Sequence, residues 1–352
     1  MIDREPTPAI QQGFEAGADI PTPTTPTTPT TPQARRGWSP RRRGSVPQEM
    51  RILAVVAAVG VLLSLTTPTF LTEGNLTAVA IGSATDSIIA IAMTIVLIGG
   101  GFDLSVGAVL ALSGIVLALL IQDGLATPPA IAATLFLGVV IGTVNGVIIT
   151  KVRVNPLITT LGMMSIASSV ALILSGGTSS ALLPSDLLFI GQGLIVGLPV
   201  SVLLTILLVV IGDVLLRRTR WLRLVYYVGG NERAAALSGI PVDRVRIASY
   251  ILTGVAACVA GIVSTSRLGS AFPQAGAGTE LRVIAACVIG GCSLAGGEGS
   301  IVGSLLGVIL LALINNGLVL LNVSIYWQGV VSGLVLIAAV AFDMLSRRAR
   351  RR

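Results

Sequence analysis

The sequence predicts an all-α, polytopic membrane protein, and three observations carry that prediction. The chain of 352 residues is 53% hydrophobic and only 11% charged, whereas charged residues make up about 25% of a typical soluble domain. The apolar residues form long runs, several of which reach the roughly 20 residues that a helix needs to cross a bilayer. The basic residues are gathered at the ends of these runs.

About ten transmembrane helices can be placed in order along the chain. The first four are expected at Ile52–Phe70, Thr77–Ile98, Leu104–Gln122 and Ala130–Thr150, and the others at about 157–175, 199–216, 248–265, 281–295, 301–321 and 328–345. The run at 281–295 is short and rich in glycine, which indicates a broken or half-spanning helix. The connection at 99–103 is too brief for an ordinary loop and indicates a tight hairpin or an unwound segment.

The distribution of Lys and Arg predicts that both termini are cytoplasmic, because an excess of these residues marks cytoplasmic segments. Arginines precede the first span and follow the last, so the number of spans should be even. Basic residues also fall after the fourth and sixth spans. The loops expected on the opposite side hold mostly acidic residues, with one basic exception: Glu73, Asp123, Asp186 and Glu280, and Arg267. The net charge of +7 therefore reflects membrane topology and does not indicate nucleic-acid binding.

Three regions are expected. Residues 1–50 form a basic cytoplasmic tail with the low-complexity tract PTPTTPTTPTTP, which cannot bury a core and should be disordered. Residues 51–346 form the transmembrane domain, which includes a hydrophilic cytoplasmic segment at 217–246. Residues 347–352 form a second basic cytoplasmic tail.

Several classes of enzyme are excluded by what the sequence lacks. No stretch matches the phosphate-binding pattern G-x-x-x-x-G-K-[ST], and the chain has no His, so neither a Ser-His-Asp triad nor a His-ligated metal site can form. No cluster of carboxylates suggests acid–base chemistry. Cys258, Cys287 and Cys292 lie in apolar stretches without metal or disulfide spacing. We expect no enzymatic activity, no cofactor and no metal.

Glycines at intervals of four residues predict close helix packing. They occur at Gly138, Gly142 and Gly146, at Gly303 and Gly307, and at Gly329 and Gly333. Such small faces let membrane helices approach one another closely.

The segment 217–246 contains the longest hydrophilic stretch. Within it, Ala234–Leu237 favours a short helix that Gly239 and Pro241 would end. A short helix between spans is a suitable surface for a cytoplasmic partner, and the segment could equally be a solvated linker that joins two halves of the protein.

Five motifs, in order along residues 52–345, resemble the inner-membrane permease subunits of ribose/xylose-type ABC importers. They are GGGFDLSVGAVLALSG at 99–114, NPLITTLGMMSI at 155–166, VGGNERAAALSGI at 228–240, the segment 267–307, and NNGL at 315–318. The resemblance implies a ten-helix fold like that of the vitamin B12 importer's permease, in the bacterial inner membrane. It also implies three kinds of partner: a second permease chain, two cytoplasmic ATPase subunits and an extracytoplasmic sugar-binding protein.

The resemblance assigns a coupling role to the segment from Asn231 and Glu232 to Gly239. In ABC importers a Glu-Ala-Ala…Gly pattern forms the helix that seats in the ATPase. Here Ala234, Ala235 and Gly239 match the pattern, and Arg233 stands where it has Glu. The match predicts that Gly239→Asp, or a bulky residue at position 235, uncouples ATP hydrolysis from uptake.

Five further polar residues are candidates for the translocation path or for a helix cap. A carboxylate at mid-membrane costs about 2.5–3.5 kcal/mol, so Asp103 either caps the helix that follows from Leu104, with Ser105 and the glycines beside it, or lines the path. Asp86 either lines the path or forms a hydrogen bond between helices. Asn315 and Asn316 can bond across helices, and packing is their default role.

Two rival functions and two rival cargoes remain open at this point. Asp86 and Asp103 could carry protons in a proton-coupled secondary transporter. The basic tails and the segment 217–246 could belong to a membrane receptor or scaffold. Within the importer family, the cargo could be a nucleoside or a furanose-like signal molecule instead of a sugar.

Overall fold

The computed structural model describes residues 48–324, apart from residue 182, and isolated positions between 327 and 341. The two predicted tails therefore lie outside the described residues, save for the first tail's last three positions. The helices are α1 (Gln48–Thr66), α2 (Glu73–Ile98), α3 (Val106–Gln122), α4 (Thr127–Val147), α5 (Pro156–Ser175), α6 (Ser185–Gln192), α7 (Val200–Arg218), α8 (Arg220–Gly230), α9 (Glu232–Leu237), α10 (Val242–Leu268), α11 (Thr279–Ile289) and α12 (Ile301–Leu320). A π-helical turn, η1 (Ile148–Val152), extends α4.

Seven of these helices are long and apolar enough to cross a membrane, namely α1, α2, α4 with η1, α5, α7, α10 and α12. The polytopic prediction is thereby supported. α3 is apolar but has 17 residues, and α11 has only 11, which confirms that the span predicted at 281–295 is a half-length helix. The tenth predicted span, 328–345, lies largely outside the described residues.

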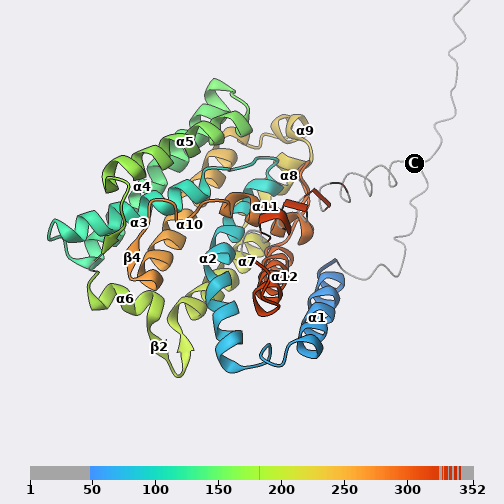
Figure 1. Ribbon diagram of the computed structural model, residues 1–352. Coiled ribbons are helices and arrows are strands. Elements are labelled where there is room, and N and C mark those ends of the chain that lie inside the picture. Colours follow the sequence, from blue (N-terminus) through green and yellow to red (C-terminus); the bar gives the residue numbers. More distant parts are fainter. Residues whose placement is uncertain are drawn as a thin grey trace, which may run out of the picture. The chain divides into compact units, whose positions relative to one another are not determined.

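Within the described residues, four short strands form two small antiparallel pairs. β1 (Ser180–Ala181) pairs with β4 (Ser270–Ala271), with Ser180 opposite Ala271. β2 (Leu194–Ile195) and β3 (Leu198–Pro199) form a hairpin that precedes α7. Figure 1 shows this hairpin and α9 at opposite ends of the helical body.

Local signals explain where the helices begin and end. The side chain of Asn155 accepts a hydrogen bond from the Leu157 N–H at 2.8 Å, and Pro156 occupies the first position of α5, where its missing N–H costs nothing. Gly176 ends this helix in the left-handed region, at φ 60°. The side chain of Ser300 begins α12 in the same way, accepting from the Gly303 N–H at 3.0 Å.

α10 is the central helix, packed against α2, α3 and α4 (Figure 1). The predicted glycine spacing is confirmed at its contact with α4. A Cβ atom on Gly138 would lie 2.6 Å from the Gly254 carbonyl oxygen, and one on Gly146 would lie 2.8 Å from the Ile247 Cα. Backbones therefore touch there, and only glycine fits. At Gly329 and Gly333 nothing among the described residues lies within 4 Å of such a Cβ.

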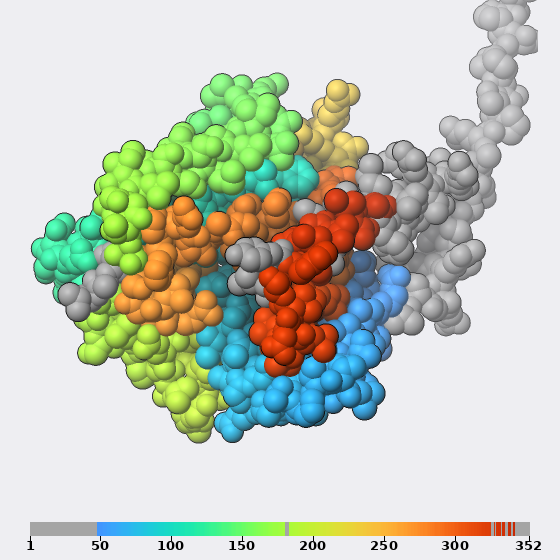
Figure 2. Space-filling view, in the orientation of Figure 1, coloured from blue at the N-terminus to red at the C-terminus, as the bar shows by residue number. Residues whose placement is uncertain are grey.

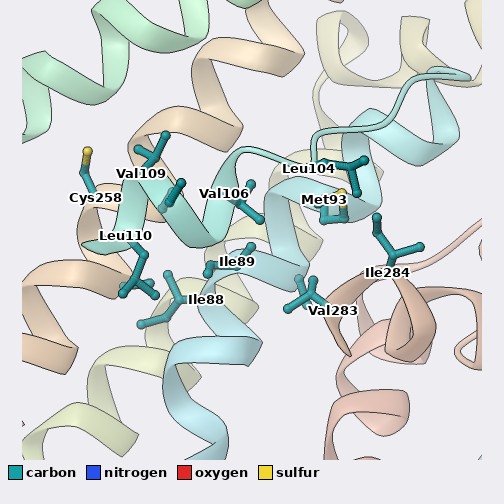
Figure 3. Close-up of a cluster of buried hydrophobic side chains, with 14 of the residues drawn as sticks. Ile88, Ile89, Met93, Leu104, Val106, Val109, Leu110, Cys258, Val283 and Ile284 are labelled. Atoms are coloured by element: carbon teal, nitrogen blue, oxygen red, sulfur yellow. The ribbon is translucent and has the colours of Figure 1, made fainter. Parts of the chain in front are cut away.

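The main core fills the space where α2, α3, α10 and α11 meet. Figure 3 shows Ile89 and Met93 of α2 facing Val106 of α3 and Val283 of α11. Cys258, Cys287 and Cys292 are buried free thiols, as the apolar stretches around them in the sequence predict.

Two non-helical segments, 99–105 and 290–300, interrupt this core and lie side by side. The Gly297 N–H donates to the Ile98 carbonyl oxygen at 2.8 Å, and a Cβ on Gly296 would lie 3.0 Å from the Gly100 Cα. The prediction of an unwound segment at 99–103 is confirmed, because α2 ends at Ile98 and α3 begins at Val106.

Candidate functional site

The hydrophilic segment 217–246 folds into two short helices that rest on the body through their apolar residues. α8 buries Val225 and Val228, and Ala235 of α9 joins the same cluster with an exposed fraction of 4%. The Tyr226 hydroxyl donates to the Gly299 carbonyl oxygen at 3.0 Å, and burial raises the pKa of this tyrosine. The segment is therefore a fixed platform and not a solvated linker.

Polar residues at the N-terminal end of α9 hold this helix in place. Asn231 Oδ1 accepts the Ala234 N–H at 3.0 Å and caps the helix. Glu232 accepts two hydrogen bonds from Arg246 of α10, at 2.9 and 2.8 Å. This paired geometry is the strong form of an Arg–carboxylate contact, so α9 is fixed to the first turns of α10.

The outward face of α9 is free in the described part of the chain. Arg233, Ala234 and Gly239 are exposed, and Leu237 exposes 91% of its surface. Figure 2 shows this segment standing out from the surrounding surface. Among the predicted coupling residues, Ala235 points into the protein, whereas Arg233, Ala234 and Gly239 are exposed. The sequence analysis did not single out Leu237.

The platform contacts the unwound segment that leads to Asp103. If Gly229 carried a Cβ atom, that atom would collide with the Ile98 carbonyl oxygen and would lie 2.7 Å from the Gly297 nitrogen. The end of α8 is therefore in backbone contact with the end of α2 and with the segment 290–300. Such contact offers a mechanical connection from α9 to the core.

Asp103 lies in a buried hydrogen-bond network and exposes 1% of its surface. Its Oδ1 accepts the Ser105 N–H at 3.0 Å and the Ser105 hydroxyl at 2.6 Å. Asn145 of α4 donates to the Ser105 Oγ at 3.2 Å, and the Tyr250 hydroxyl donates to the Phe102 carbonyl oxygen at 3.0 Å. The predicted cap of a helix from Leu104 is wrong in detail: the helix begins at Val106, and the carboxylate closes the turn before it.

The other candidates share a cavity of about 690 Å³ between α2, α11 and α12. Asp86 lines it from α2, and Asn315 and Asn316 line it from α12. Asn316 also exchanges two amide hydrogen bonds with Asn75, at 2.7 and 3.1 Å, which supports its packing role. Asp103 and Ser105 do not line this cavity.

Arg282 is the residue in this cavity that the sequence analysis missed. It forms an ion pair with Asp86, with 3.2 Å between Nε and Oδ2. A lone arginine inside the predicted span 281–295 was the available signal, because a charge at that depth calls for a partner of opposite sign.

Comparisons with known proteins show which family the chain belongs to. The family model described as the permease component of the branched-chain amino acid transport system matches residues 75–340. The ribose import permease protein of Escherichia coli (strain K12) is 40% identical over 300 residues, which cover 84% of this chain and 93% of that protein. The ribose import permease protein of Bacillus subtilis (strain 168) is 42% identical over 285 residues, covering 80% and 88%.

A third relative carries a different sugar in its name. The L-arabinose transport system permease protein of Escherichia coli (strain K12) is 37% identical over 316 residues, which cover 88% of this chain and 94% of that protein. No solved structure matches the chain. The long apolar helices and these relatives identify a multi-pass protein of the bacterial inner membrane. The chain belongs to the permease family of the branched-chain amino acid transport system, on the branch of the ABC sugar importers.

Proposed function

We propose that this permease translocates a monosaccharide, with a pentose as the first candidate, and that an extracytoplasmic binding protein delivers it. Relatives named for ribose and for L-arabinose support a pentose. A second permease chain completes the passage, and two cytoplasmic ATPase subunits supply the energy. No P-loop occurs in this sequence, so the nucleotide must be hydrolysed elsewhere.

The observation that carries this proposal is the α8–α9 platform. It presents an exposed apolar residue, Leu237, on a helix that is fixed by Asn231 and by the Glu232–Arg246 pair. A helix held this rigidly and left uncovered is suited to seat in a partner protein. The basic residues of 217–246 assign the platform to the cytoplasmic side, where an ATPase has its nucleotide.

The buried groups divide into two roles in this proposal. Asp103 and Ser105 hold the unwound segment 99–105 in shape, next to the backbone contacts that lead from the platform. Asp86 and Asn315 line the path, and Asn316 fixes its outer end through Asn75. A path of this kind needs few strong contacts, because the binding protein supplies the affinity.

The test is sugar uptake into proteoliposomes that contain the permease. We expect ribose or arabinose to accumulate only when the ATPase subunits, ATP and the binding protein are all present. Accumulation without any ATPase subunit would contradict the proposal. Uptake that stops when the proton gradient is collapsed, with ATP still present, would establish the proton-coupled alternative. Saturation of the binding protein by a nucleoside or a furanose-like signal molecule, but by no sugar, would reassign the cargo.

A further inference from the structure

The cavity between α2, α11 and α12 brings together donors and acceptors of hydrogen bonds on walls that are otherwise apolar. Ser83 and Asp86 line it from α2, Arg282 from α11 and Asn315 from α12, among residues such as Val308. About 690 Å³ lies within the range of 300–1,000 Å³ that small-ligand sites occupy. The cavity therefore has both the size and the polar groups of a binding site.

The ion pair in this cavity is incompletely satisfied. Arg282 Nε lies 3.2 Å from Asp86 Oδ2, and Nη2 lies 3.4 Å from Oδ1, whereas charge-assisted bonds of this type usually measure about 2.7–2.9 Å. Nη2 also donates to the Thr279 Oγ1 at 2.9 Å. No hydrogen bond within residues 48–324 reaches Nη1, so the guanidinium keeps donors for another acceptor.

Both partners face the cavity. The Arg282 side chain exposes 34% of its surface and the Asp86 side chain 20%. A pair that served only to join α2 to α11 would gain little here, because apolar contacts do the same without the cost of burying charge. The exposed charges therefore require a different explanation.

The chemistry of the pair selects one class of ligand. A carboxylate accepts hydrogen bonds and a guanidinium donates them, and side by side the two carry no net charge. Adjacent hydroxyl groups can donate to Asp86 and accept from Arg282 at once. An anion or a cation would instead compete for one partner and leave the other unpaired, which is costly in a membrane.

We propose that Asp86 and Arg282 form a binding site for the hydroxyl groups of an uncharged polyol, with Asn315 lining the same cavity. As a step in transport, the site rests on the proposed function. It selects hydroxylated, neutral cargo inside the permease, in addition to any selection by a binding protein. Hydroxyl groups replace water on the pair as the cargo enters the cavity.

The test uses a cysteine introduced at Ser83, which lines the same cavity. The complete complex carrying Ser83→Cys, in detergent, is labelled with a thiol reagent while ribose is present or absent. The three native cysteines are buried, with exposed fractions of 2% or less, and serve as unreactive background. We expect ribose to slow labelling and tetrahydropyran, the same ring without hydroxyls, to have no effect. Val196→Cys, at a position 97% exposed, is the control that ribose should not protect.

Two variants in this background identify the groups responsible. The double variant Asp86→Asn/Arg282→Gln replaces the pair without changing the net charge. In this variant the ribose concentration needed for protection should rise about tenfold, because the loss of one charge-assisted hydrogen bond weakens binding by about that factor. Lys151→Gln removes an exposed ion pair elsewhere, with Asp243, and should leave protection unchanged. Equal protection by ribose and tetrahydropyran, or unchanged protection in the double variant, would overturn the proposal.

Labelling and uptake separate this proposal from the proposed function. Protection by ribose without ATP-driven uptake would support the polyol site and refute the importer. ATP-driven uptake without protection would support the importer and refute the site.

Discussion

Leu237 offers the sharpest test of the α9 platform, because it exposes 91% of its surface and nothing in the described body depends on it. Burial of apolar groups contributes about 0.8 kcal/mol per CH₂. If the residue is buried in the ATPase, Leu237→Ala removes three carbons and costs about 2 kcal/mol of binding free energy. That corresponds to a roughly 30-fold rise in Kd. Alanine also favours helix, so α9 should remain folded.

The assay is a titration of the purified permease with its ATPase subunit, followed by binding-protein-stimulated ATP hydrolysis. Val196→Ala is the matched control, since this apolar residue is 97% exposed in the β2–β3 hairpin, at the other end of the body (Figure 1). We expect Leu237→Ala to weaken the complex and Val196→Ala to leave its Kd unchanged. An unchanged Kd for Leu237→Ala, with the chain folded, would refute the assignment of α9 as the docking surface.

The two substitutions that the family pattern suggested, Gly239→Asp and a bulky residue at position 235, are less informative than Leu237→Ala. Ala235 is 4% exposed and packs against the body, so a bulky residue there would disturb α9 itself. Gly239 has φ +80°, a conformation that other residues adopt with strain. Loss of coupling in either variant would therefore mix misfolding with lost docking, which Leu237→Ala avoids.

Two further predictions concern the core. Asp103→Asn keeps an oxygen that accepts hydrogen bonds from Ser105, so this variant should fold and transport. Asp103→Ala leaves the Ser105 donors unpaired and should lower the free energy of unfolding by about 1–3 kcal/mol. An Asn variant that folds but fails in uptake would show that the charge itself serves transport. Gly142→Leu would press a side chain into the backbone of α10 and cost about 1–3 kcal/mol, seen as a lower Tm. Gly162→Leu, where nothing lies within 4 Å, is its control, and equal Tm values for the two variants would contradict the close contact of α4 with α10.

Features that depend on residues close together in the sequence were predictable. Long apolar runs give helices of membrane-crossing length, and the glycine spacing at Gly138 and Gly142 indicates a close contact whichever helix is the partner. The unwound segment at 99–103 and the half-length α11 also follow locally, since short glycine-rich stretches cannot sustain a full span. The start of α3 was misplaced by two residues because hydropathy does not report the turn that Asp103 and Ser105 close.

The exposure of Leu237 and the partner of Arg282 could not be predicted in the same way. Leu237 belongs to an apolar run, and only the orientation of α9 on the body decides that Ala235 is covered and Leu237 is not. Asp86 and Arg282 are separated by 196 positions along the chain. No periodicity within one helix indicates which residue of another helix will face it.

The sequence by itself determined that this protein spans the membrane many times, that it belongs to a permease family and where its hydrophilic segment lies. These properties follow from composition, run length and motif order, which are local. Only the tertiary structure decided which polar groups meet. Asp103 is bonded to Ser105 in a buried network, and Asp86 pairs with Arg282 in a cavity. The physical reason is that helix packing brings together side chains from distant segments, and the free energy of a buried charge depends on those neighbours.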